Sequence, residues 1–238
     1  MAVRFQSLYA LPPGGIPGLP LSKSQAGYHR AQQRMKRQFE YIYAHDVWGN
    51  GSGEGSLEIH TRPYVRFLQG FLRDRAIASV VDFGCGDWQF SQTIDWSGID
   101  YRGFDIVPSV ILANRAKYQK ANIIFHEIEP PYNALPEADL LIVKDVLQHW
   151  SDESVFAFLP VLARYRYALV TNCVNPAGST KNLPIEDAGF RYLDIRLPPF
   201  NLAAREVLSF ANHRGLRERL FEKPRWLKKV LLVENIGR

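Results

Sequence analysis

The sequence predicts an α/β fold of the doubly wound type, with a seven-stranded sheet that is mostly parallel and ends in a C-terminal antiparallel hairpin. Two observations lead to this fold. Between residues 78 and 172, short apolar runs alternate with stretches of helical spacing, and near-continuous apolar strands of this kind are buried on both faces of a parallel sheet. Two further apolar runs, 205–213 and 228–236, close the chain and are joined by a basic segment, which is the pattern of a hairpin.

The first 55 residues precede this pattern and form a predicted appendage. Residues 11–27 are dense in Pro and Gly, so an irregular arm is expected there. Residues 28–48 have apolar side chains at helical spacing, and the stretch GNGSGEGS, residues 49–56, is expected to be a flexible loop. Ser56 is a candidate N-cap for a helix that continues to about Arg73. We therefore expect an N-terminal arm, helix and lid loop over residues 1–55 and one core domain over residues 56–238.

The core pattern consists of strands and helices in alternation. The expected strands span 78–83, 101–106, 122–128, 139–144 and 167–172, and the expected helices span 88–94, 108–118 and 152–165. Pro108 lies in the first turn of the second helix, where its missing N–H costs nothing. Ser151 is positioned to cap the third helix.

Composition limits the class of protein. The chain has 238 residues and two cysteines, so it is long enough for a buried core and has too few thiols for a disulfide framework or a four-cysteine zinc site. The histidines lack metal-ligand spacing, and no metal is expected. No apolar run reaches the ~18 residues that span a bilayer, and the N-terminus lacks a secretory signal, so we expect a soluble, cytoplasmic protein without a membrane partner.

Two basic segments, 29–37 and 213–229, carry much of the net charge of +5. Such segments can face nucleic acid. Aromatic residues do not alternate with them in a stacking pattern, so solvated helix faces are the favoured interpretation. The sequence leaves the oligomeric state open.

The stretch VVDFGCGDW, residues 80–88, indicates a ligand site, because ligands of doubly wound sheets bind outside the carboxyl ends of strands where the strand order reverses. Gly84 lets the chain turn, and Gly86 lets the backbone approach a ligand. Asp105 ends the second strand, 19 residues after Gly86. An acid there accepts hydrogen bonds from ribose hydroxyls, or alternatively serves the start of the next helix. Gln89 replaces the third glycine of the dinucleotide fingerprint, which disfavours an oxidoreductase.

VVDFGCGDW, followed by GFDI and then by EADLLIVKDVLQHW, resembles the Rossmann-like core of the class I S-adenosylmethionine-dependent methyltransferases over residues 78–173. WGNGSGEGS before this core and NLPIEDAGFRYLDIRLPPF after it look like elements of a bacterial subgroup of these enzymes. The resemblance implies S-adenosylmethionine as cofactor and methyl transfer to a hydroxyl or amine of a small molecule, such as a sugar or secondary metabolite. The alternatives are an RNA or protein methyltransferase and a non-catalytic protein that binds S-adenosylmethionine.

The resemblance also implies roles for single positions. Asp82 is the acid that opens the glycine-rich turn. Trp48 would cover the bound cofactor, or instead anchor the N-terminal helix, and Arg62 would pair with the cofactor carboxylate. Lys144 would contribute its backbone carbonyl, with its side chain expected at the surface. The other expected cofactor contacts are Gly84, Cys85, Gly86, Asp87, Trp88, Asp105, Ile106, Glu127 and Ile128, where Glu127 replaces the commoner Asp.

Methyl transfer is an in-line displacement, so alignment and exclusion of water are the main tasks, and a base serves only to take a proton from the acceptor. In KDVLQHW, His149 is the candidate base, with a packing or hydrogen-bonding role as the alternative. Asp145 lies on the same face as His149 if the segment is helical, and it is expected to brace the loop. The acceptor is expected against residues 174–200, where Arg191 and Phe200 either shape its site or close the fold.

Overall fold

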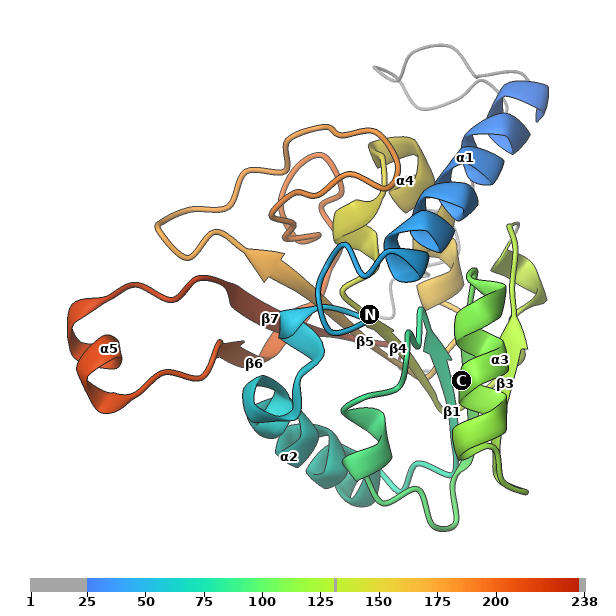
Figure 1. Ribbon diagram of the computed structural model, residues 1–238, viewed down its shortest axis with the longest axis horizontal. Helices are drawn as coiled ribbons and strands as arrows, with labels where there is room; N and C mark the ends of the chain where they lie inside the picture. The colour runs from blue at the N-terminus through green and yellow to red at the C-terminus, as the bar shows by residue number, and fades with distance from the viewer. Residues whose placement is uncertain (1–24, 131, 236–238) are drawn as a thin grey trace, which may run out of the picture.

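The computed structural model describes residues 25–130 and 132–235 (Figure 1). Seven strands form one sheet in the order β3-β2-β1-β4-β5-β7-β6. Neighbours from β3 to β5 are parallel, and β7 pairs antiparallel with both β5 and β6, so the predicted architecture is confirmed. The strands are β1 Ser79–Phe83, β2 Asp100–Asp105, β3 Ile123–Glu127, β4 Leu140–Lys144, β5 Tyr167–Val174, β6 Arg205–Ala211 and β7 Leu227–Glu234.

The strand order reverses beside β1. The chain runs outward from β1 to β2 and β3, and then returns to β4 on the other side of β1. A crevice forms outside the carboxyl ends of the strands at such a reversal. The glycine-rich turn follows β1 directly, so the topology places it at the edge of the sheet where a ligand is expected.

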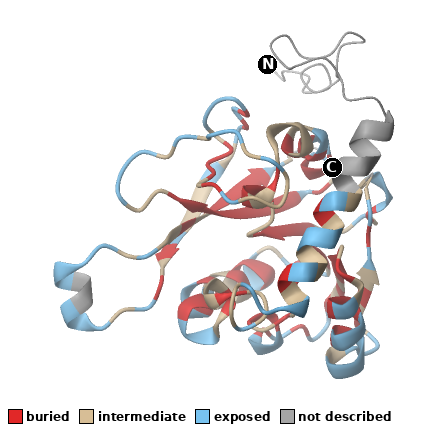
Figure 2. Cartoon of the chain, turned by 45° about the horizontal axis from the view of Figure 1, so that its top comes forward, coloured by how far each residue is buried: buried red, intermediate tan, exposed pale blue. Residues whose placement is uncertain are grey.

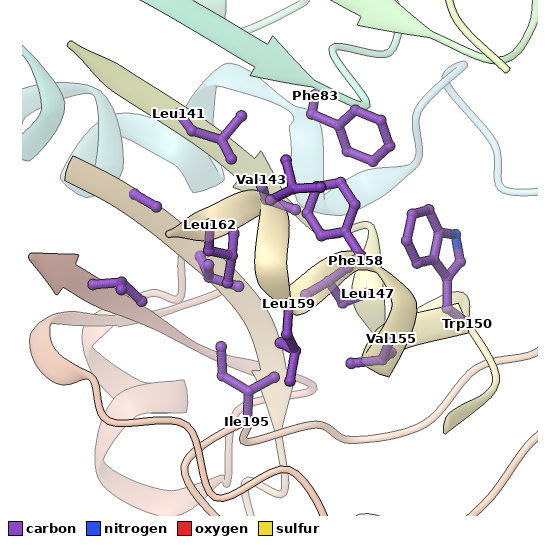
Figure 3. Close-up of a cluster of buried hydrophobic side chains, with 14 of the residues drawn as sticks. Phe83, Leu141, Val143, Leu147, Trp150, Val155, Phe158, Leu159, Leu162 and Ile195 are labelled. Atoms are coloured by element: carbon purple, nitrogen blue, oxygen red, sulfur yellow. The ribbon is translucent and has the colours of Figure 1, made fainter. Parts of the chain in front are cut away.

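Helices cover both faces of the sheet. They are α1 Gln25–Ala44, α2 Glu58–Asp74, α3 Pro108–Tyr118, α4 Asp152–Leu162 and α5 Leu216–Phe221. Successive strand residues belong to two hydrophobic clusters, because side chains alternate across a strand. Figure 3 shows one cluster, in which Phe158 of α4 lies beside Val143 of β4. The other cluster packs α2 and α3 onto the opposite face, while the arm that carries α5 projects from the sheet and is largely exposed (Figure 2).

Two predicted helix starts are confirmed. Pro108 is the first residue of α3. Ser151 caps α4, and its Oγ accepts a hydrogen bond from Ser154 N at 3.3 Å. The N-terminal helix is also present, although it begins at Gln25 and ends at Ala44, before Trp48. Most of the predicted irregular arm lies outside the described residues, and its last three residues belong to α1.

The predicted helix over residues 88–94 is wrong. Only a short 3-10 turn, Ser91–Thr93, forms there. Trp88 has a positive φ of 59°, which is incompatible with a right-handed helix, and its buried ring packs against Tyr101 and Phe125. Anchoring of this ring to the core therefore overrides the local helical spacing.

Two further local predictions are corrected. Ser56 does not cap α2, because the N-cap is Leu57 and Ser56 ends a 3-10 turn in which its Oγ donates to Ser52 O. Asp145 and His149 do not share a helix face, since Asp145 has a φ of 61° and only the 3-10 turn Leu147–His149 follows it.

Within the described ranges, no helix has both the length and the apolar character needed to cross a membrane. In the same residues, no group of three His, Cys, Asp or Glu side chains is placed to hold a metal ion.

Candidate active site

Two cavities meet at the carboxyl ends of the central strands. The larger has a volume of about 650 Å³ and the smaller about 90 Å³. The walls of the two cavities share Tyr43, Trp48, Gly84, Asp145 and His149. The smaller cavity is mainly apolar, whereas the larger one contains most of the charged side chains. The two cavities therefore form one cleft with an apolar end and a polar end.

The glycine-rich turn is the floor between the cavities. Gly84 N donates to Phe104 O at 2.8 Å, which ties the turn to β2. Gly84 and Gly86 have φ values of 75° and 54°, in the region that favours glycine. A Cβ atom on Gly84 would lie 2.2 Å from Cγ2 of Val146. The two glycines are thus required both by backbone conformation and by lack of space.

Asp105 lies beside this turn, as the sequence predicts. Its Oδ2 accepts from Gly86 N and its Oδ1 from Val107 N, both at 3.0 Å. Burial raises the pKa of the carboxyl, and the backbone N–H groups oppose that shift. The bond to Val107 also serves the start of α3, and this helix-start role does not exclude the ligand role expected from the sequence. Each carboxylate oxygen retains a second lone pair for a hydroxyl donor.

The apolar end of the cleft surrounds Asp105. Ile106 and Ile128, both expected from the sequence, line the smaller cavity together with Tyr132. Met35 and Phe39 of α1 cover it from the other side. An acid within an apolar enclosure suits a ligand that combines a flat apolar ring system with hydroxyl groups.

Asp82 lies in the wall of the larger cavity. Its Oδ2 accepts from the Tyr101 hydroxyl at 2.6 Å. Burial raises the pKa of Asp82 to about 6, while Tyr101 and Lys144 act in the opposite direction. Asp82 and Asp105 therefore lie on either side of the glycine-rich turn as two buried acids. In each, the surrounding hydrogen bonds and charges do not fully offset the cost of burying the ionised carboxylate.

The side chain of Lys144 is buried, so its expected place at the surface is wrong. Its Nζ contacts Asp145 Oδ2 at 2.5 Å, and Lys228 Nζ contacts the same oxygen at 2.6 Å. Burial alone would raise the pKa of Asp145, but the two ammonium groups outweigh it and lower the pKa to about 2. Asp145 is therefore ionised and holds the two lysine side chains together, while its expected role in bracing the loop stays a prediction.

The glycine loop, residues 49–56, docks onto the turn after β1. Ser52 N donates to Asp87 Oδ2 at 3.0 Å, and Asp87 N donates to Ser52 Oγ at 3.1 Å. The Tyr43 hydroxyl of α1 lies 2.8 Å from Ser52 Oγ. Asp87, expected as a cofactor contact, thus connects the loop to the core. Its neighbours Cys85 and Trp88 line the larger cavity.

Trp48 and His149 lie where the cavities meet. Their ring centroids are 5.4 Å apart, and the Trp48 ring also contacts Phe39 and Tyr43 at 5.9 Å. Trp48 therefore both anchors α1 and forms part of the cleft wall, so the two roles weighed from the sequence are compatible.

Hydrogen bonds define the state of His149. Its Nδ1 lies 2.8 Å from Gly189 O, so this nitrogen carries the proton and donates. Burial lowers the pKa of His149, which favours the neutral ring. Gln148 Oε1 accepts from Cys173 N, so the Gln148 amide nitrogen, 3.3 Å from His149 Nε2, is a donor. Nε2 is thus an acceptor, and an acceptor hydroxyl would have to replace the Gln148 amide as its hydrogen-bond donor for His149 to act as a base.

The structure does not bring two expected contacts to the cleft. Arg62 lies on the exposed face of α2, where it pairs with Glu58 at 3.3 Å. Glu127 is exposed at the end of β3 and belongs to neither cavity wall. Both expectations came from position along the chain, which does not fix the direction of a side chain.

The loop after β5 contributes to the cleft through different residues than expected. Arg191 is buried away from it and donates to Trp150 O at 2.9 Å, and Phe200 is packed in the core, so both close the fold. Cavity residues that the sequence did not point to include Tyr43, Ser52, Phe190, Tyr192, Arg225, Trp226 and Lys228. The signal in the sequence that could have indicated them is the presence of aromatic residues beside the glycine loop, such as Tyr43, and in the C-terminal segment, such as Trp226.

Comparison with known proteins relates this fold and its glycine-rich turn to methyltransferases. The family model of the O-methyltransferase domain matches residues 58–174. No curated protein sequence matches the chain. The similar solved structures include magnesium protoporphyrin IX methyltransferase from Synechocystis PCC 6803 with bound S-adenosylhomocysteine, at a TM-score of 0.56 and 15% identity, covering 85% of this chain and 98% of that one.

Two other solved structures extend the comparison. N-methyltransferase NodS from Bradyrhizobium japonicum WM9, also with S-adenosylhomocysteine, has a TM-score of 0.54 and 13% identity over 87% of this chain and 99% of that one. Human N-acetylserotonin methyltransferase with S-adenosylmethionine has a TM-score of 0.50 and 15% identity over 91% of this chain and 60% of that one.

The fold is that of the Rossmann-like class I methyltransferases. The family match supports a methyltransferase, and S-adenosylmethionine is the cofactor that this family uses. The subgroup resemblance of residues 48–56 stays a prediction.

Proposed function

We propose that this protein is an S-adenosylmethionine-dependent methyltransferase that acts on a hydroxyl or amine of a small molecule. The observation that carries the proposal is the pair of buried acids, Asp82 and Asp105, on either side of the turn that contains Gly84 and Gly86. S-adenosylmethionine carries a sulfonium and an ammonium group, and a cationic ligand compensates buried carboxylates.

The cleft has separate groups for the parts of this cofactor. Asp105 would accept hydrogen bonds from the ribose hydroxyls, while Ile106 and Ile128 would enclose the adenine. Gly84 and Gly86 would allow the amino-acid part to approach the backbone. When bound, the cofactor supplies an electrophilic methyl group on sulfur.

The chain's own residues would then serve the acceptor. Trp48, Phe190 and Tyr192 give the larger cavity aromatic walls against which an acceptor would pack. His149 Nε2 would take the proton of an acceptor hydroxyl, a contribution of about 10²- to 10⁴-fold. Asp145 takes no proton in this proposal, because its bonds to two lysines keep it ionised.

Ligand-dependent unfolding tests cofactor binding. S-adenosylhomocysteine at 100 times its dissociation constant should stabilise the wild-type protein by about 2.7 kcal/mol, and NAD should not. Asp105→Asn should lose most of this stabilisation, because the Asn amide has one acceptor oxygen where the carboxylate has two. Asp100→Asn is the matched control, since Asp100 begins the same strand and pairs with Arg102 at 2.9 Å. Equal stabilisation of wild-type protein and Asp105→Asn would contradict the assignment.

The reaction itself is tested with labelled cofactor. Extracts incubated with the protein and methyl-labelled S-adenosylmethionine should contain one small compound that gains the labelled methyl group, detected by mass spectrometry. Label in RNA or protein would instead favour those acceptors, and binding of mixed RNA with a steep salt dependence would agree with the former. Cofactor binding without any labelled product would favour the non-catalytic alternative.

A further inference from the structure

Two lysines form a cationic pair in the wall of the larger cavity. Lys144 ends β4 and Lys228 lies near the start of β7, with β5 between these strands. The side chain of each is only 5% exposed. Because both Nζ atoms contact Oδ2 of Asp145, the two ammonium groups lie within about 5 Å of one another, a distance at which like charges repel strongly away from water.

The hydrogen bonds of this pair are incomplete. An ammonium group has three N–H donors. Within the described residues, Lys144 Nζ donates only to Asp145, and Lys228 Nζ donates to Asp145 and, at 3.4 Å, to Gly55 O. Trp226 Nε1 is buried without a partner, and Lys228 Nζ lies 4.8 Å from the centre of its ring. Unused donors of three side chains therefore belong to the wall of one cavity.

The two lysines also share their ion-pair partner. One carboxylate, Asp145, pairs with two ammonium groups. Asp82 acts on Lys144 through space, but its hydrogen bond is with Tyr101. Glu54, at the same cavity, is occupied by Arg225 at 3.3 Å and lies 3.5 Å from His60. Two buried ammonium groups that share one carboxylate and keep free N–H donors can bind an anion through those donors.

We propose that Lys144 and Lys228 form a binding site for the oxygen atoms of an anionic group, a carboxylate or a phosphate. Trp226 Nε1 supplies a third donor, and Asp145 positions the two ammonium groups. The inference rests on the proposed function, because the occupant is a substrate of that reaction. The chemistry is shared by two sources, which are the amino-acid carboxylate of the cofactor and an anionic group on the acceptor.

Lys228→Met is the test variant. It removes one ammonium group and leaves the Lys144–Asp145 pair balanced, so the fold is expected to persist, which far-UV circular dichroism checks. Lys229→Met is the matched control, because Lys229 is the next residue of β7 and pairs with Glu206 at 2.9 Å. Lys228→Arg keeps the charge and should behave more like the wild type.

Calorimetric titration tests the cofactor source. S-adenosylhomocysteine carries the amino-acid carboxylate, whereas 5′-methylthioadenosine has the nucleoside and the thioether without it. If the carboxylate of the cofactor occupies the site, Lys228→Met weakens S-adenosylhomocysteine binding at least tenfold and leaves 5′-methylthioadenosine binding unchanged. The Lys229→Met control binds both as the wild type does.

Anion probes test the acceptor source. If the acceptor supplies the anion, S-adenosylhomocysteine binding is unaltered in Lys228→Met, while acetate or inorganic phosphate raises the unfolding temperature of the cofactor-saturated wild type and not of the variant. Sodium chloride at equal ionic strength is the reference. An unaltered response of Lys228→Met in both the nucleoside and the anion experiments overturns the proposal. Failure of the proposed function is distinguishable, because the wild type would then not bind S-adenosylhomocysteine at all.

Discussion

Replacing Asp145 by Asn tests the electrostatics of the cleft directly. The substitution keeps the shape of the side chain but strands Lys144 and Lys228, which both contact Asp145 Oδ2. Breaking a buried ion pair by removing one partner costs about 3–5 kcal/mol. A pKa of about 2, against the ordinary value of 3.8, gives a second, lower figure of about 2 kcal/mol for the charge alone. For a chain of this size, such losses correspond to a fall in unfolding temperature of roughly 5–20 °C.

The pH dependence has a definite sign. The folded-state pKa of Asp145 lies below its unfolded value, so its contribution to stability is complete above about pH 4 and is lost as the pH falls towards 2. The difference in unfolding free energy between the wild type and Asp145→Asn should therefore be largest near neutral pH and shrink in acid.

Differential scanning calorimetry at pH 7 and chemical unfolding between pH 2 and pH 7 measure these quantities. The double variant Asp145→Asn/Lys228→Met should regain a large part of the lost stability, because only one ammonium group then lacks its partner. A loss below about 1 kcal/mol in the single variant, or no recovery in the double variant, would refute the reasoning.

Three other substitutions probe the turn, the base and the buried acid. Gly84→Ala should cost roughly 2–5 kcal/mol in urea unfolding, because φ is 75° and the new Cβ would overlap Val146; adding Val146→Ala should restore the overlap part but leave the ~1–2 kcal/mol of backbone strain. His149→Gln should lower kcat by about 10²-fold or more and leave the Kd for S-adenosylhomocysteine unchanged. Because burial lowers the pKa of His149, the rate of the wild type should rise with pH around a midpoint below 6.5, and a midpoint above pH 6.5 would count against the base role. Burial raises the pKa of Asp82 to about 6, so the free energy of unfolding of the wild type should fall by up to about 3 kcal/mol as the pH rises from about 4 to 6. The Asn side chain of Asp82→Asn still accepts from Tyr101 but does not ionise, so this pH dependence should disappear. Identical curves of stability against pH for the two proteins would contradict the assignment.

Two position-specific predictions were confirmed because their causes are local. Pro108 begins α3 because its fixed φ and missing N–H suit a first helical turn, and Ser151 caps α4 through its own hydroxyl. The helix expected at residues 88–94 failed, because the Trp88 ring is held by side chains of β2 and β3 that lie far away in sequence. Local spacing carries no information about such partners.

The candidate site divides in the same way. Gly84, Gly86 and Asp105 were found because a strand that ends in a glycine-rich turn, and an acid at the end of the next strand, are patterns that parallel sheets bring together. The side chain of Lys144 was wrongly expected at the surface, and the hydrogen bonds of Asp87 with the glycine loop were not foreseen. Asp87 accepts a hydrogen bond from Ser52, and Lys144 is buried against Tyr64 of α2. Neither contact can be inferred from the residues next to Asp87 or Lys144 in the sequence.

The sequence alone determined the succession of strands and helices along the chain and the places of the glycine-rich turn and of Asp105 at the ends of their strands, since these follow from hydrophobic period and backbone preference. Only the tertiary structure decided that the glycine loop closes on Asp87, that His149 holds its proton on Nδ1, and that Lys228 meets Asp145 across 83 residues of chain. Those contacts join segments that are distant in sequence, and their energies depend on burial, which exists only after the sheet has formed.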